Sequence, residues 1–134
     1  MTGQTNLFEV LKSLQVSCDG VEYGFASVKE YQSNSDDRIL GTFKENEGLT
    51  IIASKEYFET NNIQYEGPYA KLTIEVHTSL ELVGLTAVLA RKLADNQISA
   101  NVVAGYYHDL IFVQYAVRQK AVEAIENLKE VQIK

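Results

Sequence analysis

The most regular alternation of apolar and polar residues lies in the second half of the chain. Residues 72–76 alternate strictly between the two kinds, which is typical of a strand with one buried face. Leucines then recur every three or four residues from 82 to 93, which indicates a helix with one apolar stripe that ends at Asp95-Asn96. The same pattern predicts strands over 98–104 and 110–115, a helix over 117–128 and a short final strand over 131–133.

The order of these elements over residues 69–134 is β-α-β-β-α-β. This order is that of the ferredoxin-like fold, which belongs to the α+β class. It places two helices on one face of a four-stranded antiparallel sheet and leaves the other face bare. We therefore expect the bare face to be covered by the first half of the chain or by a second chain.

The first half predicts a degraded copy of the same plan. Its predicted elements are a helix over 7–14, strands over 21–25, 38–44 and 49–53, and a short helix over 54–58 that Ser54 caps and Asn61-Asn62 ends. Residues 29–37 are almost devoid of apolar side chains, so they predict an exposed loop where a helix would lie. Gly67-Pro68 contains the only proline and is the best candidate for an internal boundary. We therefore predict two subdomains, over 1–66 and 67–134.

Composition excludes several classes of protein. The chain has 134 residues, is 46% hydrophobic and has a net charge of −6, which argues against nucleic-acid binding because that requires a basic surface. A single cysteine and two histidines leave no disulfide and no zinc site, so no metal and no cofactor are expected. No apolar run approaches the roughly 20 residues that span a membrane. Since the N-terminal residues also lack the apolar centre of a signal peptide, we expect a soluble, cytoplasmic protein.

Gly84 interrupts the apolar stripe of the first helix in this half. If that helix begins at Thr78, a glycine at its seventh position costs about 1 kcal/mol relative to alanine. In the other interpretation, residues 78–84 form a strand-to-helix turn whose exposed N–H groups receive a carboxylate, since helix N-termini favour anions. Ser79 would add a hydroxyl group to that turn. The pattern alone leaves both interpretations open.

His108-Asp109 lies at the mouth of a predicted hairpin, a common position for functional residues. A nucleophilic triad with Ser79 is disfavoured, because adjacent residues near a strand end point to opposite faces. A metal site is disfavoured as well, because His77 and His108 are the only histidines and no third ligand is evident. Asp109 is left with two roles: it accepts N–H groups of the turn, or it holds the ammonium or guanidinium group of an amino acid.

These residues together resemble a family. With EGLT at 47–50, the stretch LTIEVHTSLELVGLTAVLARKLADNQISANVVAGYYHDLIFV at 72–113 is similar to the tandem ACT-domain proteins of bacteria. Those are small uncharacterised proteins related to the ACT modules of aspartokinases and of a eukaryotic cytosolic arginine sensor. The similarity covers about residues 21–134 and is most specific over 76–85 and 99–113. It implies two ACT-like subdomains with the β-α-β-β-α-β plan.

The resemblance also implies where a ligand would lie. ACT domains typically bind amino acids between modules, near the turn from the first strand to the first helix. That turn runs here from Thr78 to Leu85, and Gly84 stands at the place of the characteristic ACT glycine. Asn101 is on the neighbouring strand, and Asp109 matches the acidic residue after the turn that precedes the third strand. The candidate ligand-binding residues are Thr78, Ser79, Leu80, Val83, Gly84, Leu85, Asn101 and Asp109.

We therefore expect a regulatory protein that binds a free amino acid, forms a homodimer and has no catalytic activity of its own. One alternative is a protein-interaction module that dimerises without a ligand. The other is a small enzyme that uses His108 and Asp109. The sequence does not identify the amino acid.

Overall fold

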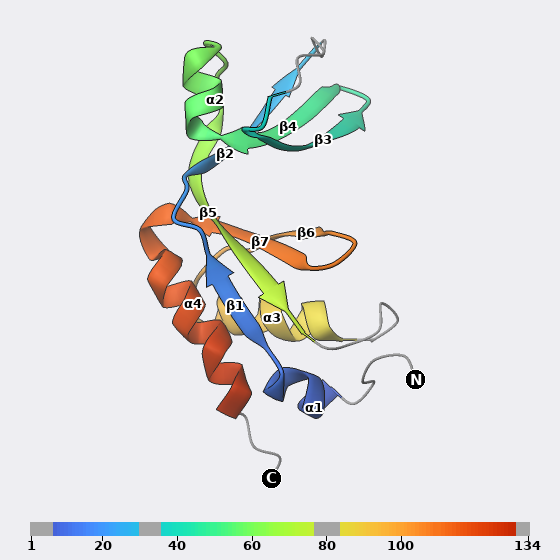
Figure 1. Ribbon diagram of the computed structural model, residues 1–134, viewed down its shortest axis with the longest axis vertical. Helices are drawn as coiled ribbons and strands as arrows, with labels where there is room; N and C mark the ends of the chain where they lie inside the picture. The colour runs from blue at the N-terminus through green and yellow to red at the C-terminus, as the bar shows by residue number, and fades with distance from the viewer. Residues whose placement is uncertain (1–6, 30–35, 77–83, 131–134) are drawn as a thin grey trace.

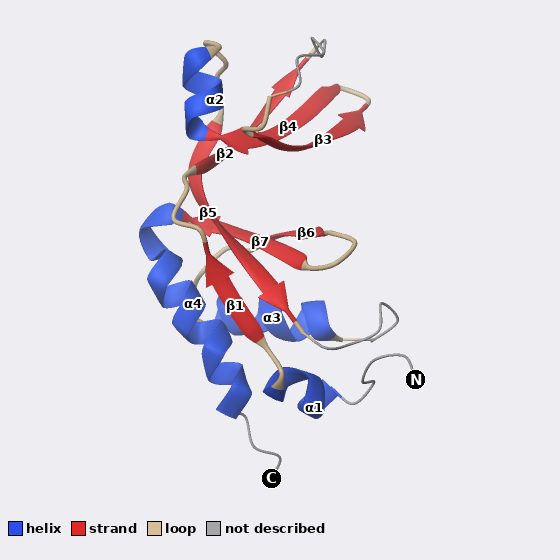
Figure 2. Cartoon of the chain, in the orientation of Figure 1, coloured by secondary structure: helices blue, strands red, loops and turns tan. Residues whose placement is uncertain are grey.

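The computed structural model describes residues 7–29, 36–76 and 84–130, shown in Figure 1 and by element type in Figure 2. Its strands are β1 (Gln15–Cys18), β2 (Tyr23–Val28), β3 (Ile39–Glu45), β4 (Gly48–Ser54), β5 (Glu66–Glu75), β6 (Asn101–Ala104) and β7 (Asp109–Gln114). Its helices are α1 (Leu7–Lys12), α2 (Lys55–Thr60), α3 (Leu85–Asp95) and α4 (Arg118–Glu126), with the 3-10 helices η1 (Tyr115–Val117) and η2 (Asn127–Glu130). All described strand pairs are antiparallel, in the order β3-β4-β2-β5-β7-β6, and β1 also pairs with β5.

Strand β5 is shared by two sheet units. Its beginning pairs with β2 through Tyr69 and Tyr23, and its end pairs with β1 through Leu72 and Cys18. Tyr69 and Leu72 also pair with β7, which occupies one edge of β5. The strands β1 and β2 must therefore lie end to end along the other edge of β5. The first unit is therefore β3-β4-β2-β5, and the second is β1-β5-β7-β6 (Figure 1).

The α+β, ferredoxin-like arrangement predicted for two subdomains is confirmed, and most predicted elements lie close to their expected bounds. Ser54 begins α2 as predicted, since its side chain accepts a hydrogen bond from the N–H of Tyr57 at 3.4 Å. The strand β1 was not predicted. The predicted strand over 131–133 and most of the predicted loop over 29–37 lie outside the described residues.

Gly67-Pro68 lies inside β5, so both units continue through the position that the sequence favoured as a boundary. Residues 7–18 pack with the second unit, because β1 pairs with the end of β5 and α1 packs against the same core. The division into residues 1–66 and 67–134 stays a prediction about the domains.

Each unit has its own core beneath its helices. In the second unit α1, α3 and α4 cover the sheet, as Figure 2 shows. The buried side chains there come from both ends of the chain: Val10, Leu11, Leu14, Ala70, Leu72, Ile74, Leu85, Leu89, Leu93, Ile98, Ile111, Val113, Ala121, Ala124, Ile125 and Leu128. In the first unit α2 covers a smaller core, formed by Ala26, Ile51, Ala53 and Phe58.

A third apolar cluster joins the faces of the two sheets that carry no helix. Phe112 of the second unit makes edge-to-face contacts with Tyr23 and Phe25 of the first, at ring-centroid distances of 5.9 and 5.2 Å. Ile52 is buried in the same cluster. Close to β5, the first half of the chain therefore covers the helix-free face of the second half. This is one of the two possibilities that the sequence left open, the other being a second chain.

Three polar side chains, Asp19, Tyr23 and Lys71, hold the place where the units meet, and we call them the junction cluster. Asp19 lies in the link between β1 and β2. Its carboxylate accepts hydrogen bonds from the Tyr23 hydroxyl at 2.5 Å and from the N–H of Val21 at 3.0 Å. The Lys71 Nζ atom of β5 lies 3.3 Å from the same carboxylate and 5.2 Å from the centre of the Tyr23 ring.

The junction cluster perturbs the pKa of two of its members. Burial by itself would raise the pKa of Asp19, but the hydrogen bonds from Tyr23 and Val21 and the charge of Lys71 outweigh it, so this pKa lies below its usual value. Burial and the Asp19 carboxylate together raise the pKa of Tyr23. Near neutral pH the cluster therefore combines a carboxylate, a neutral phenol and an ammonium group.

We predict that Leu14→Ala destabilises the second unit more than the first. Leu14 is fully buried, and truncation of such a leucine typically costs about 2–5 kcal/mol. Denaturant unfolding should show this loss, and hydrogen exchange should accelerate in β7 more than in β4. Leu40→Ala is the matched control, because that side chain is 40% exposed in the first unit. Equal losses in the two variants would contradict the packing of the N-terminal residues against the second unit.

We predict that Tyr23→Phe lowers the free energy of unfolding by about 1.5–3 kcal/mol at pH 7, the usual range for a hydrogen bond to a charged group. Asp19 has a lowered folded-state pKa, so its contribution is complete above the unfolded pKa of about 4 and is lost as the pH falls through the folded value. The difference between wild type and variant should therefore shrink in acid. Tyr107→Phe, at an 84% exposed residue, is the control and should change stability little. A difference that stays constant from pH 7 to pH 2 would refute this role of Asp19.

Candidate functional site

Gly84 forms the N-cap of α3. Its backbone has φ 99° and ψ −11°, a left-handed conformation that favours glycine, and as a glycine it has no side chain with which to cap the helix. The N–H of Val88 donates to the Gly84 carbonyl at 3.0 Å. The interpretation that placed Gly84 inside a helix beginning at Thr78 is therefore wrong, because the helix begins at Leu85.

The start of α3 presents backbone donors. The first N–H groups of a helix have no partner within it, and the helix dipole makes this end positive. Leu85 contributes only its backbone to the surface, because its side chain is 6% exposed and lies in the core. A side chain of α1 flanks the turn, since a Cβ atom on Gly84 would lie 3.9 Å from Leu7 Cδ2. The sequence had not connected Leu7 with this turn.

The four other residues predicted for this turn are outside the described part of the chain. They are Thr78, Ser79, Leu80 and Val83. Their place in the site stays a prediction.

Asp109 begins β7 and pairs with Ile74 near the end of β5. Since side chains alternate along a strand, Asp109 shares a face with the buried Ile111, which is the face that the helices cover. The carboxylate is partly buried there. Because α3 follows β5 in the chain, Asp109 lies at the end of the sheet from which the chain proceeds to Gly84.

Asn101 does not join Asp109. It pairs with Phe112, three residues further along β7, and therefore lies on the opposite face of the sheet. Its side chain is exposed, and its Nδ2 atom donates to the Phe112 carbonyl oxygen at 3.3 Å. The structure thus separates two residues that the sequence assigned to a single site.

His108 has an acidic partner other than Asp109. Its Nε2 atom lies 3.5 Å from Glu75 Oε1 at the end of β5, and the two side chains are 43% and 50% exposed. Glu75 follows Ile74 on β5, so its side chain lies on the sheet face opposite to that of Asp109. His108 contacts Glu75 on that opposite face, in agreement with the prediction that the side chains of His108 and Asp109 point to opposite faces. Sequence reasoning missed Glu75, because the contact depends on the register between β5 and β7.

Sequence reasoning also missed a cluster of charged side chains around Arg38, the residue just before β3. Its guanidinium donates to both oxygens of Asp36, at 2.9 and 2.8 Å, and reaches Glu56 of α2 at 3.3 Å. These hydrogen bonds lower the pKa of Asp36 to about 2 and raise that of Arg38. Arg38 thereby connects the segment before β3 to α2.

The described part of the chain contains neither a candidate metal-binding cluster nor a candidate membrane-spanning helix. Across residues 7–29, 36–76 and 84–130, no three His, Cys, Asp or Glu side chains gather where they could hold a metal ion. None of the helices within those ranges combines the length and the apolar content needed to cross a membrane.

Family models match nearly the whole chain. One ACT domain model matches residues 2–70 and another matches residues 64–127. The two matches overlap over residues 64–70, which include the beginning of β5, the strand that the two units share. No curated protein matches the chain.

Solved structures share the fold of this chain. A Vibrio cholerae protein of unknown function, described as a possible transport protein, is 37% identical with a TM-score of 0.84, over 92% of this chain and 95% of its own. A protein from Agrobacterium tumefaciens is 13% identical with a TM-score of 0.72, over 87% and 89% of the two chains.

The ligand-free regulatory subunit of aspartate kinase from Thermus thermophilus shares the fold at 11% identity, with a TM-score of 0.58 over 87% of this chain and 98% of its own. The family assignment rests on the ACT domain model that matches more than half of the chain and on the 37% identity to the Vibrio cholerae protein. This chain therefore belongs to the ACT-domain family, as a tandem of two ACT modules.

Proposed function

We propose that this tandem ACT protein is a regulatory protein that binds a free amino acid and does not catalyse a reaction. The observation that carries the proposal is the start of α3 at the left-handed Gly84, which has no side chain to bond the first N–H groups of the helix. A carboxylate would accept hydrogen bonds from the first N–H groups of the helix, where the dipole favours negative charge. The fold shared with an aspartate kinase regulatory subunit is consistent with this role.

Asp109 would bind the other end of the ligand. Its partly buried carboxylate lies on the helix-covered face, at the end of the sheet that leads to α3. An ammonium group there would gain a charge-assisted hydrogen bond. Thr78, Ser79, Leu80 and Val83 belong to the same proposed turn. Asn101 lies on the other face, so we assign it no contact in this module.

The arrangement favours binding over catalysis. His108 and Asp109 lie on opposite faces of the sheet, and the partner of His108 is the exposed Glu75. A general base held in place by Asp109 is therefore absent from the described geometry. A panel for hydrolase and isomerase activity tests this. Turnover that both His108→Ala and Asp109→Ala abolish would show that the protein is an enzyme.

We predict that one of the twenty amino acids raises the melting temperature of the protein. At a hundredfold excess over the dissociation constant, binding stabilises the folded state by about 2.7 kcal/mol. Asp109→Asn preserves the size of the side chain and removes its charge, so it should weaken the affinity at least tenfold in calorimetry. Asp95→Asn is the matched control, because Asp95 lies at the far end of α3 in an exposed ion pair with Arg91. An amino acid that binds both variants equally well would place the site elsewhere.

A module that interacts with proteins and takes no ligand is the second candidate. It is favoured by Tyr106 and Tyr107 at the tip of the β6–β7 hairpin, which are 78% and 84% exposed. Aromatic side chains of this kind are enriched in protein interfaces. If no amino acid changes the melting temperature, this second candidate is preferred.

We further propose that the protein forms a homodimer, and we predict twice the chain mass in light scattering at micromolar concentration. Along the described sheet, β3 is an edge strand of seven residues, and Phe43 on it is 49% exposed. Such an edge offers unpaired N–H and C=O groups to a second strand. Phe43→Lys should shift the population toward the monomer, whereas Lys44→Arg, which preserves the charge on the same strand, should not. A strict monomer in the wild type would refute the proposal.

A further inference from the structure

The outer edge of β3 is regular over only part of the strand. The pairing between β3 and β4 shifts between Ile39 and Gly41, so Leu40 is the extra residue of a β-bulge. From Gly41 to Glu45 every residue then pairs in step with β4. We call residues 41–45 the regular edge.

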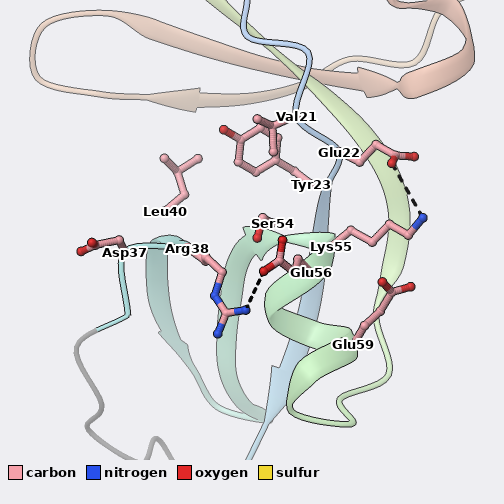
Figure 3. A pocket seen from close by; sticks show the side chains of 10 residues that line it. All are labelled: Val21, Glu22, Tyr23, Asp37, Arg38, Leu40, Ser54, Lys55, Glu56 and Glu59. Carbon is pink, nitrogen blue, oxygen red and sulfur yellow. Dashed lines mark hydrogen bonds and ion pairs between the residues drawn. The ribbon is translucent and has the colours of Figure 1, made fainter.

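The residues that precede the regular edge belong to a pocket of the first unit. Arg38 and Leu40 line this pocket of about 580 Å³ together with Val21, Tyr23 and residues of α2. Figure 3 shows both there, with Arg38 joined to Glu56. The bulge therefore separates a part of the chain that is engaged within the first unit from a part that is open to a partner.

One hydrogen bond shows which way the backbone of β4 points. The N–H of Ser54 donates to the carbonyl oxygen of Arg38 at 3.0 Å, so the backbone groups of Ser54 point toward the β3 side. Backbone groups point to alternate sides of an antiparallel strand, so those of Ile52 and Thr50 also point toward β3. Their hydrogen bonds are made with the residues opposite them.

The free backbone groups of the regular edge follow from this alternation. Gly41 lies opposite Ile52, and Phe43 lies opposite Thr50, so both use their N–H and C=O groups within the sheet. The groups of Thr42 and Lys44 consequently point outward. Since β3 is the last strand in the described sheet order, no described strand pairs with them.

The strand β3 is better suited to pairing than the other edges of the described sheet. The strands β1 and β6 have four residues each, whereas β3 has seven. The exposed side chain of Phe43 also lies in the middle of the regular edge. A second copy of β3 is therefore the strand for which we examine this edge.

Symmetry allows few registers for such a pair. In an antiparallel dimer with a two-fold axis, one residue lies opposite its own copy. An axis at Lys44 would place two ammonium groups directly opposite each other, which is destabilising. An axis at Thr42 would pair Lys44 with Leu40 in the bulge. An axis at Phe43 pairs the whole regular edge with itself.

We propose that two copies of this chain join through their regular edges, antiparallel, with Phe43 opposite Phe43. This inference rests on the homodimer proposed above and specifies its interface. Thr42 would exchange backbone hydrogen bonds with Lys44 of the other copy. The two Phe43 rings, each 49% exposed in the single chain, would cover each other. Glu45 would lie over Gly41 of the other copy, where a Cβ atom would meet nothing within 4 Å.

Single-cysteine variants locate the axis. We introduce Thr42→Cys, Phe43→Cys and Lys44→Cys separately into the Cys18→Ser chain, which removes the one native thiol. A residue on the axis can form a disulfide with its own copy, whereas its neighbours lie beyond the Cα separation of about 4.4–6.8 Å that a disulfide requires. Mild oxidation should therefore give at least tenfold more covalent dimer from Phe43→Cys than from either other variant. Cys18→Ser alone is the control and should give none.

A mixture of two variants tests the same register with Phe43 intact. Equal amounts of Thr42→Cys and Lys44→Cys should form a disulfide between the two different chains, identified by its mass. Self-linked Thr42→Cys or Lys44→Cys in its place would move the axis and overturn the register. A wild type of dimer mass that gives no disulfide in any of these samples would place the interface elsewhere. A monomeric wild type would refute the homodimer itself, so the two failures are distinguishable.

Discussion

The antiparallel pairing of β5 is the interaction on which the rest of the structure depends. One strand of ten residues pairs with β2 at its beginning, with β1 at its end and with β7 along the other edge. Both modules therefore share backbone hydrogen bonds with a single segment, and their sheets are continuous through it. The core of the second module takes Ala70, Leu72 and Ile74 from this strand, so loss of the strand would open that core.

The shared strand also determines where polar groups meet. Because β1 and β2 follow one another along β5, the link between them lies beside Lys71, and Asp19 and Tyr23 are brought to that ammonium group. Tyr23 then has two surroundings: its ring contacts Phe112 of the second unit and also lines the pocket of the first. Tyr23 therefore belongs both to the joint between the modules and to the wall of this pocket.

The sequence predicted those helices and strands whose buried face can be recognised from the spacing of their own apolar residues, or whose ends are marked by a capping residue. The α3 stripe, the Ser54 cap and the alternation over 72–76 were of this kind. The strand over 15–18 was missed because its four residues are only half buried, and its partner is more than fifty residues away. The candidate site stays a prediction: Gly84 begins α3 and Asp109 lies at one end of the second sheet, whereas Asn101 is on the opposite face of that sheet. Only the register of β6 on β7 reveals the position of Asn101, and only the register of β5 on β7 reveals Glu75 beside His108.

The position of the N-terminal segment constrains the order in which the chain can fold during synthesis. Val10, Leu11 and Leu14 are buried against a core that includes Leu128, and α1 contacts η2 near the other end of the described chain. α1 therefore lacks its contacts with η2 until residues 127–130 have emerged from the ribosome. A nascent chain that stops before α4 leaves this core incomplete, so chaperone binding to α1 should last until α4 and η2 have emerged.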